Sequence, residues 1–401
     1  MNRFLTYLRF TDRLGGTLLL LAFWGVLLRA FAVHMAPRLG YLVGAPILPD
    51  QPCGRPECDF SVFWPAGVLS THMSFSVIYT PYLFNAAAKT LLLPQITYQT
   101  FFYPPTALLV FWPLAHLPFE TAAFAWLLGS TACAVMLLRF AGFGWLVIIV
   151  GLLAPASLLD FQICQFGIIT GAIFLASIRL AERRGFLGGG LAGIFVVKPQ
   201  LGLLLPFLWG AKRNLRALTG FALVSGGIVL LSIWLFGTAA WHAYLTLGRQ
   251  QSFQILAAPF DPHGAQGWGV SIYWMVRSFG ISSFNATVIQ LASAVLAVAY
   301  IFSRKWSPEE RLFKMVCLSL LATPYANTPD MVAFSLMLAE SARQRGWRLG
   351  LLDAILFLWP GICLVVSIAT GHELTPLIVL AALLRAALPA RPPVLPALAQ
   401  E

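Results

Sequence analysis

Long apolar stretches recur along almost the whole chain, from about residue 14 to about residue 390, with only short polar or Pro- and Gly-containing segments between them. The first begins at Gly15 and reads GGTLLLLAFWGVLLRAFAVHM, which is too long for a signal peptide and is interpreted as a retained span. With 59% hydrophobic and 10% charged residues, a water-soluble domain is excluded. The sequence therefore predicts an all-α polytopic membrane protein, one membrane domain over residues 1–401, with about 12 transmembrane helices.

The net charge of +11 does not indicate a nucleic-acid partner, because the basic residues form short clusters at the ends of apolar stretches. Clusters such as Arg183–Arg184, Lys212–Arg216 and Arg304–Lys314 are assigned to the cytoplasmic side, in contact with membrane lipids. The opposite side then has seven basic and eight acidic residues, against 19 and 7 on the cytoplasmic side. This asymmetry supports the orientation.

The longest hydrophilic interval, residues 35–103, is expected to be an external loop with interfacial helices, because its aromatic-rich segments look amphipathic. The apolar stretches 104–117 and 268–280 are predicted to be short re-entrant helices. Residues 391–401, which are rich in Pro, are predicted to form a disordered cytoplasmic tail.

Two apolar hairpins have basic cytoplasmic ends and a polar tip that contains Pro: Gly185–Ala211 around VKPQ, and Glu309–Ala342 around TPYANTPD. Their arms are too short to cross a bilayer, so each tip is expected to line a cavity below the outer surface. Lys198 lies in the first tip, in an otherwise uncharged apolar interval. Because charge is costly in a membrane, it is a candidate ligand for phosphate; the alternatives are a side chain that reaches water or pairs with an acid.

Asp59 and Glu57 lie in the external interval, directly before an aromatic helix. Asp59 is a candidate general base, and an N-cap role for the same residue has equal weight from the pattern alone. Cys53 and Cys58 are candidates for a disulfide that steadies this loop. No metal site and no cofactor is expected, because two carboxylates without a third ligand are weak support and no nucleotide or metalloprotease motif is present.

Six further side chains are candidates for binding a sugar or phosphate group. Tyr103 ends the external interval, Gln165 begins a later helix, and His263 lies in an outward-facing segment; each of these has an ordinary structural alternative. Tyr325 and Asp330 belong to the second Pro-containing tip, and the set of substrate-binding candidates is Glu57, Gln165, Gln200, Asp330 and His263.

The order of five segments resembles glycosyltransferase family 87, a group of GT-C membrane enzymes. These segments are CDFSVFWPAG, FFYPPTALLVFWPLAHLPF, QFGIITGAIFLA, LAGIFVVKPQLGLLLPF and LATPYANTPDMVAFSLML, and the resemblance spans roughly residues 14 to 345. It implies a GT-C fold and a hexosyltransferase that moves a sugar, commonly mannose, from a polyprenyl-phosphate donor to a lipid or glycan acceptor on the non-cytoplasmic face.

The family role of an aspartate in the first external loop as general base maps onto Asp59. Transfer would invert the anomeric configuration, with Lys198 stabilising the departing phosphate, helped by Tyr103 or Tyr325. The implied location is a bacterial inner membrane, with the active site facing the periplasm. The alternatives are a pentosyltransferase of the arabinose type with the same donor chemistry, and a lipid or solute transporter with broken helices.

Overall fold

The computed structural model describes residues 2–42, 59–92 and 100–387. Within these ranges the chain is helical and contains no strand apart from an isolated bridge between Gly269 and Asn327. The all-α prediction is confirmed, and the apolar helices make the chain a polytopic membrane protein. The predicted tail, residues 391–401, lies outside the described residues.

The helices of the first half are α1 (Asn2–Leu42), α2 (Phe60–Thr71), α3 (Phe75–Ile78), α4 (Pro81–Leu91), α5 (Pro105–Leu114), α6 (Phe119–Phe140), α7 (Trp145–Leu152), α8 (Pro155–Ile163), α9 (Gly167–Ala181), α10 (Gly185–Gly193), η1 (Ile194–Val197), α11 (Pro199–Gly202) and α12 (Leu205–Ala211). Those of the second half are α13 (Leu215–Ala243), η2 (Tyr244–Gly248), α14 (Arg249–Ala257), η3 (Ala265–Trp268), α15 (Ile272–Ser278), α16 (Ser283–Ser303), α17 (Pro308–Ala322), η4 (Thr328–Met331), α18 (Val332–Gln344), α19 (Leu351–Thr370) and α20 (Thr375–Ala387).

Among the described residues, five helical segments are long and apolar enough to cross a membrane: Thr11–Val33, Phe119–Phe140, Leu215–Ala257, Ser283–Ser303 and Leu351–Thr370. The pair α7 and α8, bent by 59°, raises the number to six. This is fewer than the expected twelve, because many apolar stretches form helices too short to cross a membrane, such as α9 with 15 residues and α12 with 7. The two stretches predicted to be re-entrant contain only the short helices α5 and α15.

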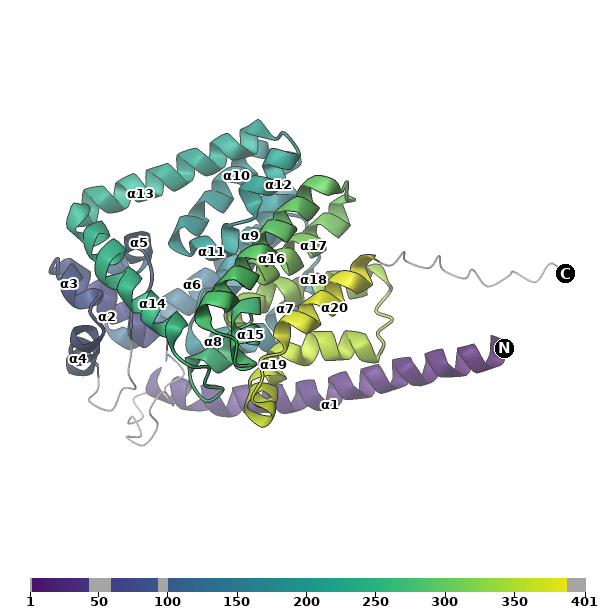
Figure 1. The fold of residues 1–401 in the computed structure, drawn as a ribbon. Helices are drawn as coiled ribbons and strands as arrows, with labels where there is room; N and C mark the ends of the chain where they lie inside the picture. Colours follow the sequence, from purple (N-terminus) through teal and green to yellow (C-terminus); the bar gives the residue numbers. More distant parts are fainter. Residues whose placement is uncertain (1, 43–58, 93–99, 388–401) are drawn as a thin grey trace.

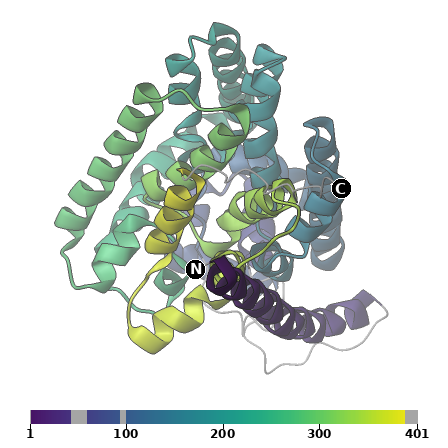
Figure 2. The same ribbon diagram turned by 90° about the vertical axis from the view of Figure 1, so that its right-hand side faces the viewer.

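The two longest helices, α1 and α13, run along opposite edges of the helical body (Figure 1). Turned by 90°, the body shows α1 projecting at its periphery (Figure 2). Helices α2 to α5 gather at one end, whereas the N-terminus and the α16–α17 connection lie toward the other (Figure 1). Close packing of α10 on α13 depends on Gly189, where a Cβ atom would meet the carbonyl oxygen of Ala217 at 1.9 Å.

The apolar interior has two main clusters. One is built around α9, α17 and α18, and the other around α2, α5 and the start of α9. Helix α2 has eight buried residues, and four of them, Phe60, Val62, Phe63 and Ala66, belong to the second cluster. The aromatic side chains Phe60 and Phe63 of this segment, which was expected to be an amphipathic interfacial helix, thus pack inside the protein. Helix α4 is more one-sided, since only Phe84 and Ala88 are buried.

Candidate functional site

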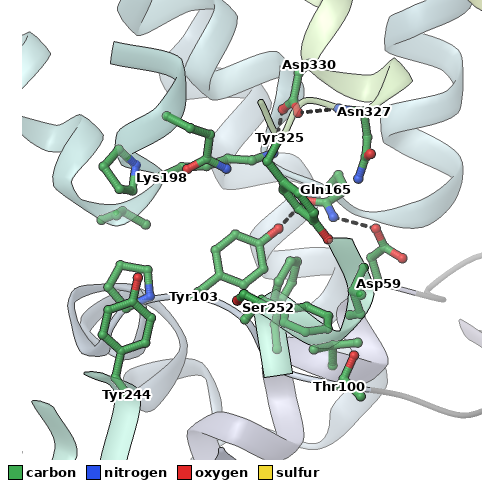
Figure 3. A pocket seen from close by; sticks show the side chains of 18 of the residues that line it. Asp59, Thr100, Tyr103, Gln165, Lys198, Tyr244, Ser252, Tyr325, Asn327 and Asp330 are labelled. Atoms are coloured by element: carbon green, nitrogen blue, oxygen red, sulfur yellow. Dashed lines mark hydrogen bonds and ion pairs between the residues drawn. The ribbon is translucent and has the colours of Figure 1, made fainter. Parts of the chain in front are cut away.

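A cavity of about 400 Å³ (Figure 3) borders the second apolar cluster, which contributes Val62, Phe63 and Val197 to its lining. Six segments far apart in the sequence supply its walls: the start of α2, residues 100–104, the α8–α9 turn, the break between η1 and α11, the η2–α14 region, and residues 325–330. The lining residues are Asp59, Val62, Phe63, Thr100, Phe102, Tyr103, Pro104, Gln165, Val197, Lys198, Pro199, Gln200, Tyr244, Ser252, Ile255, Leu256, Tyr325, Asn327 and Asp330.

Asp59 occupies the N-cap position of α2, but its side chain makes no capping hydrogen bond. Its backbone N–H donates to the carbonyl oxygen of Ile163 at 3.3 Å, which fixes the start of α2 against the end of α8. The carboxylate turns into the cavity instead of satisfying the helix terminus. The sequence left two roles open for Asp59, and its side chain does not perform the capping role.

The Asp59 carboxylate is held by the side-chain amide of Gln165. Gln165 donates through Nε2 to Asp59 Oδ2, and its Oε1 accepts from the backbone N–H of Phe166 at 3.1 Å and from the Tyr103 hydroxyl at 3.4 Å (Figure 3). Because Oε1 has these two donors, the amide must present its NH₂ group to Asp59. One carboxylate oxygen is thus fixed, and the other is left to face a ligand.

Burial changes the proton affinity of Asp59. The residue is partly exposed, but protein surrounds its carboxylate, and this desolvation raises the pKa above the ordinary value for aspartate, an effect that the hydrogen bond from Gln165 opposes. A carboxylate with a raised pKa is a stronger base than a solvated one. With one oxygen fixed by an amide donor, it can accept a proton from a hydroxyl group in the cavity.

The α8–α9 turn that carries Gln165 is held by Asp160, which sequence reasoning did not select as a site residue. The buried Asp160 carboxylate accepts from the backbone N–H groups of Gly167 at 2.6 Å and Ile168 at 3.1 Å, the first turn of α9. A Cβ atom on Gly167 would lie 2.1 Å from the carbonyl oxygen of Pro329. Only glycine lets the second Pro-containing tip approach this turn so closely.

Lys198 and Asp330 join the two Pro-containing tips. The chain breaks at Lys198 (φ −141°, ψ 69°) between η1 and α11, and its ammonium group donates to Asp330 Oδ1 at 2.5 Å in a buried ion pair. The backbone N–H of Asn327 donates to the other Asp330 oxygen at 3.0 Å. The prediction that both tips line a cavity fits the structure, which places them in one cavity, and the expected alternative of an acid partner for Lys198 is observed.

The ion pair with Asp330 does not use all the hydrogen-bond donors of Lys198. Burial disfavours its charged form, but Asp330 outweighs this effect and raises the pKa of Lys198 above its ordinary value, so the side chain stays an ammonium group. An ammonium group has three donors, and one is directed at Asp330. Two donors remain for an anionic group in the cavity. Among the described residues that line this cavity, Lys198 is the only basic one.

The other predicted residues divide into two groups. Tyr103, Tyr325 and Gln200 line the cavity, and Tyr325 reaches toward Asp59 (Figure 3). Burial raises the pKa of both tyrosine hydroxyl groups, so each is a neutral donor. His263 is exposed in the segment after α14 and does not line the cavity. Glu57, Cys53 and Cys58 lie outside the described residues.

One wall of the cavity was not foreseen. Ser252, Ile255 and Leu256 of α14 face the site, together with Val62 and Phe102 on other segments. No motif in α14 marks it as a site element; tertiary packing alone brings it there. The cavity therefore combines an apolar wall with a carboxylate, an ammonium group and amide groups, which suits a ligand with both lipid and polar parts.

The sequence profile of glycosyltransferase family 87 matches residues 101–324. The matched segment contains Tyr103, Gln165 and Lys198 but ends short of Asp59 on one side and Asp330 on the other. No curated protein and no solved structure gives a match to the chain.

Proposed function

Because this chain belongs to glycosyltransferase family 87, a GT-C type family of membrane enzymes, we propose that it transfers a sugar, most simply mannose, from a polyprenyl-phosphate donor to the hydroxyl group of a lipid or glycan acceptor. The observation that carries the proposal is that two groups share one cavity. Asp59 is held through a single oxygen by Gln165, and Lys198 has two N–H donors that are not directed at Asp330. A base and a cation are the two groups that this reaction requires.

In the proposed reaction, the free oxygen of Asp59 takes the proton of the acceptor hydroxyl. The acceptor oxygen forms a bond to the anomeric carbon while the bond from that carbon to the phosphate oxygen breaks, and the bonding electrons leave with the polyprenyl phosphate. A single displacement of this kind inverts the anomeric configuration. Phosphate is a good leaving group, so stabilisation of its charge by Lys198 matters more than a general acid.

A lipid-linked donor also accounts for the mixed lining of the cavity. The apolar side chains of Ile255 and Leu256 offer contacts to the first part of a polyprenyl chain, whereas Gln200 and Asn327 offer amide groups to sugar hydroxyls. Asp330 is bonded to Lys198 and to the backbone of Asn327, so we assign it first to holding the lysine and only second to binding the sugar.

We place the cavity on the non-cytoplasmic side of a bacterial inner membrane. The support is the charge asymmetry along the chain, which assigns the basic clusters to the cytoplasm and the segments before α2 and after α14 to the other side. On this orientation a donor of the lipid-phosphate type can reach Asp59 from the bilayer, and a glycan acceptor can reach it from the periplasm.

The proposal is tested with purified protein in nanodiscs, incubated with polyprenyl-phosphate mannose, glucose and arabinose in turn and with a short mannoside acceptor. We expect release of polyprenyl phosphate and a product of inverted configuration with the mannosyl donor. Turnover with only the arabinosyl donor would favour the pentosyltransferase alternative. If no donor is turned over, but the lipid-linked sugar crosses the membrane in proteoliposomes, the transporter alternative replaces the proposal.

A further inference from the structure

A second cavity, of about 520 Å³, lies at the far end of α17 from the site described above. It is bounded by the end of α12, the end of α16 and the start of α17. Helix α17 has 15 residues and is therefore roughly 22 Å long, so this cavity is separate from the one that contains Tyr325 and Asp330. Its volume is in the range of about 300–1,000 Å³ typical of ligand sites.

The charge of this cavity is strongly positive. Its lining includes four basic and no acidic residues, namely Lys212, Arg304, Lys305 and Arg311. The described ion pairs supply one acid: Glu182 pairs with Arg311, and it lies 3.9 Å from Lys212. Arg304 and Lys305 are exposed and have no ion pair in the described part of the chain. Burial lowers the pKa of Lys212 and Arg311, because desolvation disfavours the charged form of each side chain.

An uncharged donor gives an independent indication of a ligand. Trp306 lines the same cavity, and its indole N–H is buried without a hydrogen-bond partner among the described residues. The ring itself is well packed: it lies 5.4 Å from the ring of Tyr300 and 5.8 Å from Lys314 Nζ. A buried donor without an acceptor costs free energy, so a native structure usually satisfies it.

The position of the cavity indicates the source of an anion. It begins where α16 ends, and α16 is one of the five segments long and apolar enough to cross a membrane. Leu291, Val295, Leu296 and Phe302 of α16 are each between 57% and 69% exposed, a face suited to acyl chains. The α12–α13 and α16–α17 connections lie together at the upper right of Figure 1.

We propose that this basic cavity binds the headgroup of an anionic phospholipid. The phosphate accepts from Arg304, Lys305 and the indole N–H of Trp306, and the acyl chains lie along the exposed face of α16. Basic pockets between membrane helices bind anionic headgroups in this way. The proposal does not depend on the glycosyltransferase reaction or on the side of the membrane that the cavity faces.

Native mass spectrometry of the detergent-solubilised protein tests the proposal with phosphatidylglycerol as the probe and phosphatidylcholine as the neutral comparison. We expect wild-type protein to retain phosphatidylglycerol preferentially. The double variant Arg304→Gln/Lys305→Gln should weaken retention about thirtyfold, since each basic side chain at an anionic surface contributes about fivefold. Trp306→Phe keeps the ring and the net charge and should weaken it severalfold.

The matched control is Arg213→Gln/Arg216→Gln, which removes the same charge from exposed positions near the cavity but outside its lining. This control should retain the lipid as the wild type does. The proposal is overturned if both cavity variants retain phosphatidylglycerol at the wild-type level, if the control loses it equally, or if phosphatidylcholine is retained as well. Displacement of the lipid by millimolar inorganic phosphate would show that a free anion, rather than a lipid, is the ligand.

Discussion

Replacement of Asp59 by Asn separates the chemistry of this residue from its packing. Asn has nearly the same shape, and its amide oxygen can still accept the hydrogen bond that Gln165 donates in the native structure. Its NH₂ group would then face the cavity in place of the free carboxylate oxygen. The variant therefore loses the proton acceptor but keeps the fixed contact.

The expected loss of turnover follows from this geometry. A positioned general base contributes about 10²–10⁴-fold, which corresponds to roughly 3–5 kcal/mol in the activation free energy. Stability should not fall, because the raised pKa of Asp59 means that the folded state disfavours its charge. A raised carboxyl pKa contributes stability below the ordinary pKa, and that contribution disappears as the pH rises through the pKa of the folded state. At neutral pH, Asp59→Asn should thus leave the melting temperature unchanged or slightly higher.

The assay is the initial rate of polyprenyl-phosphate release in nanodiscs between pH 4 and 9, with thermal unfolding measured on the same samples. In the wild type the rate should rise with pH as Asp59 loses its proton, with an apparent pKa above the ordinary aspartate value. Asp59→Asn should be slow and should lack this pH-dependent rise. Asp261→Asn, which removes an exposed acid outside the cavity lining, is the matched control and should turn over normally. Wild-type turnover by Asp59→Asn would refute the assignment of the base.

Three further predictions follow from contacts in the structure. Lys198→Met should destabilise the protein by about 3–5 kcal/mol, because Asp330 is left buried without its partner. The double variant Lys198→Met/Asp330→Asn should recover most of the melting temperature but should turn over the lipid donor at least about tenfold more slowly than the wild type. Full activity of the double variant would show that the lysine does not act on the donor. Gln165→Leu removes the donor to Asp59 and should shift the pH–rate profile to higher pH, so an unshifted profile would contradict the role given to the amide. Glu373 is fully buried, only one of its carboxylate oxygens has a hydrogen-bond partner among the described residues, and burial raises its pKa to about 7. Glu373→Gln should therefore raise the unfolding free energy at pH 8, by at most on the order of 3 kcal/mol, and should have little effect near pH 4. An equal change at both pH values would exclude titration of Glu373 as the cause.

Several features of the site were accessible from local sequence alone. A lysine in an uncharged apolar interval and an aspartate at the start of an aromatic helix are conspicuous because charge is costly in a membrane. The two Pro-containing tips were recognisable from arms too short to cross a bilayer. Composition, periodicity and the thickness of the membrane are enough to identify these features.

The pairing of these features could not be predicted in the same way. Gln165 lies 106 residues from Asp59, and Lys198 lies 132 residues from Asp330, so nothing local specifies either contact. The buried environment of α2 was also missed, because aromatic side chains suit a membrane surface and a protein interior equally well, and only the packing of neighbouring helices distinguishes the two. The contribution of α14 to the cavity has the same origin.

The sequence by itself therefore determined that this protein folds in a membrane, that it is helical, and which few charged side chains require an explanation. Hydrophobic burial and the cost of an unsatisfied charge act on each residue, wherever its neighbours come from. Tertiary structure alone decided which charge meets which partner, that Asp59 turns away from its own helix terminus, and that four basic residues converge at the end of α16. Such contacts join segments distant in sequence, and they are set by how whole helices pack.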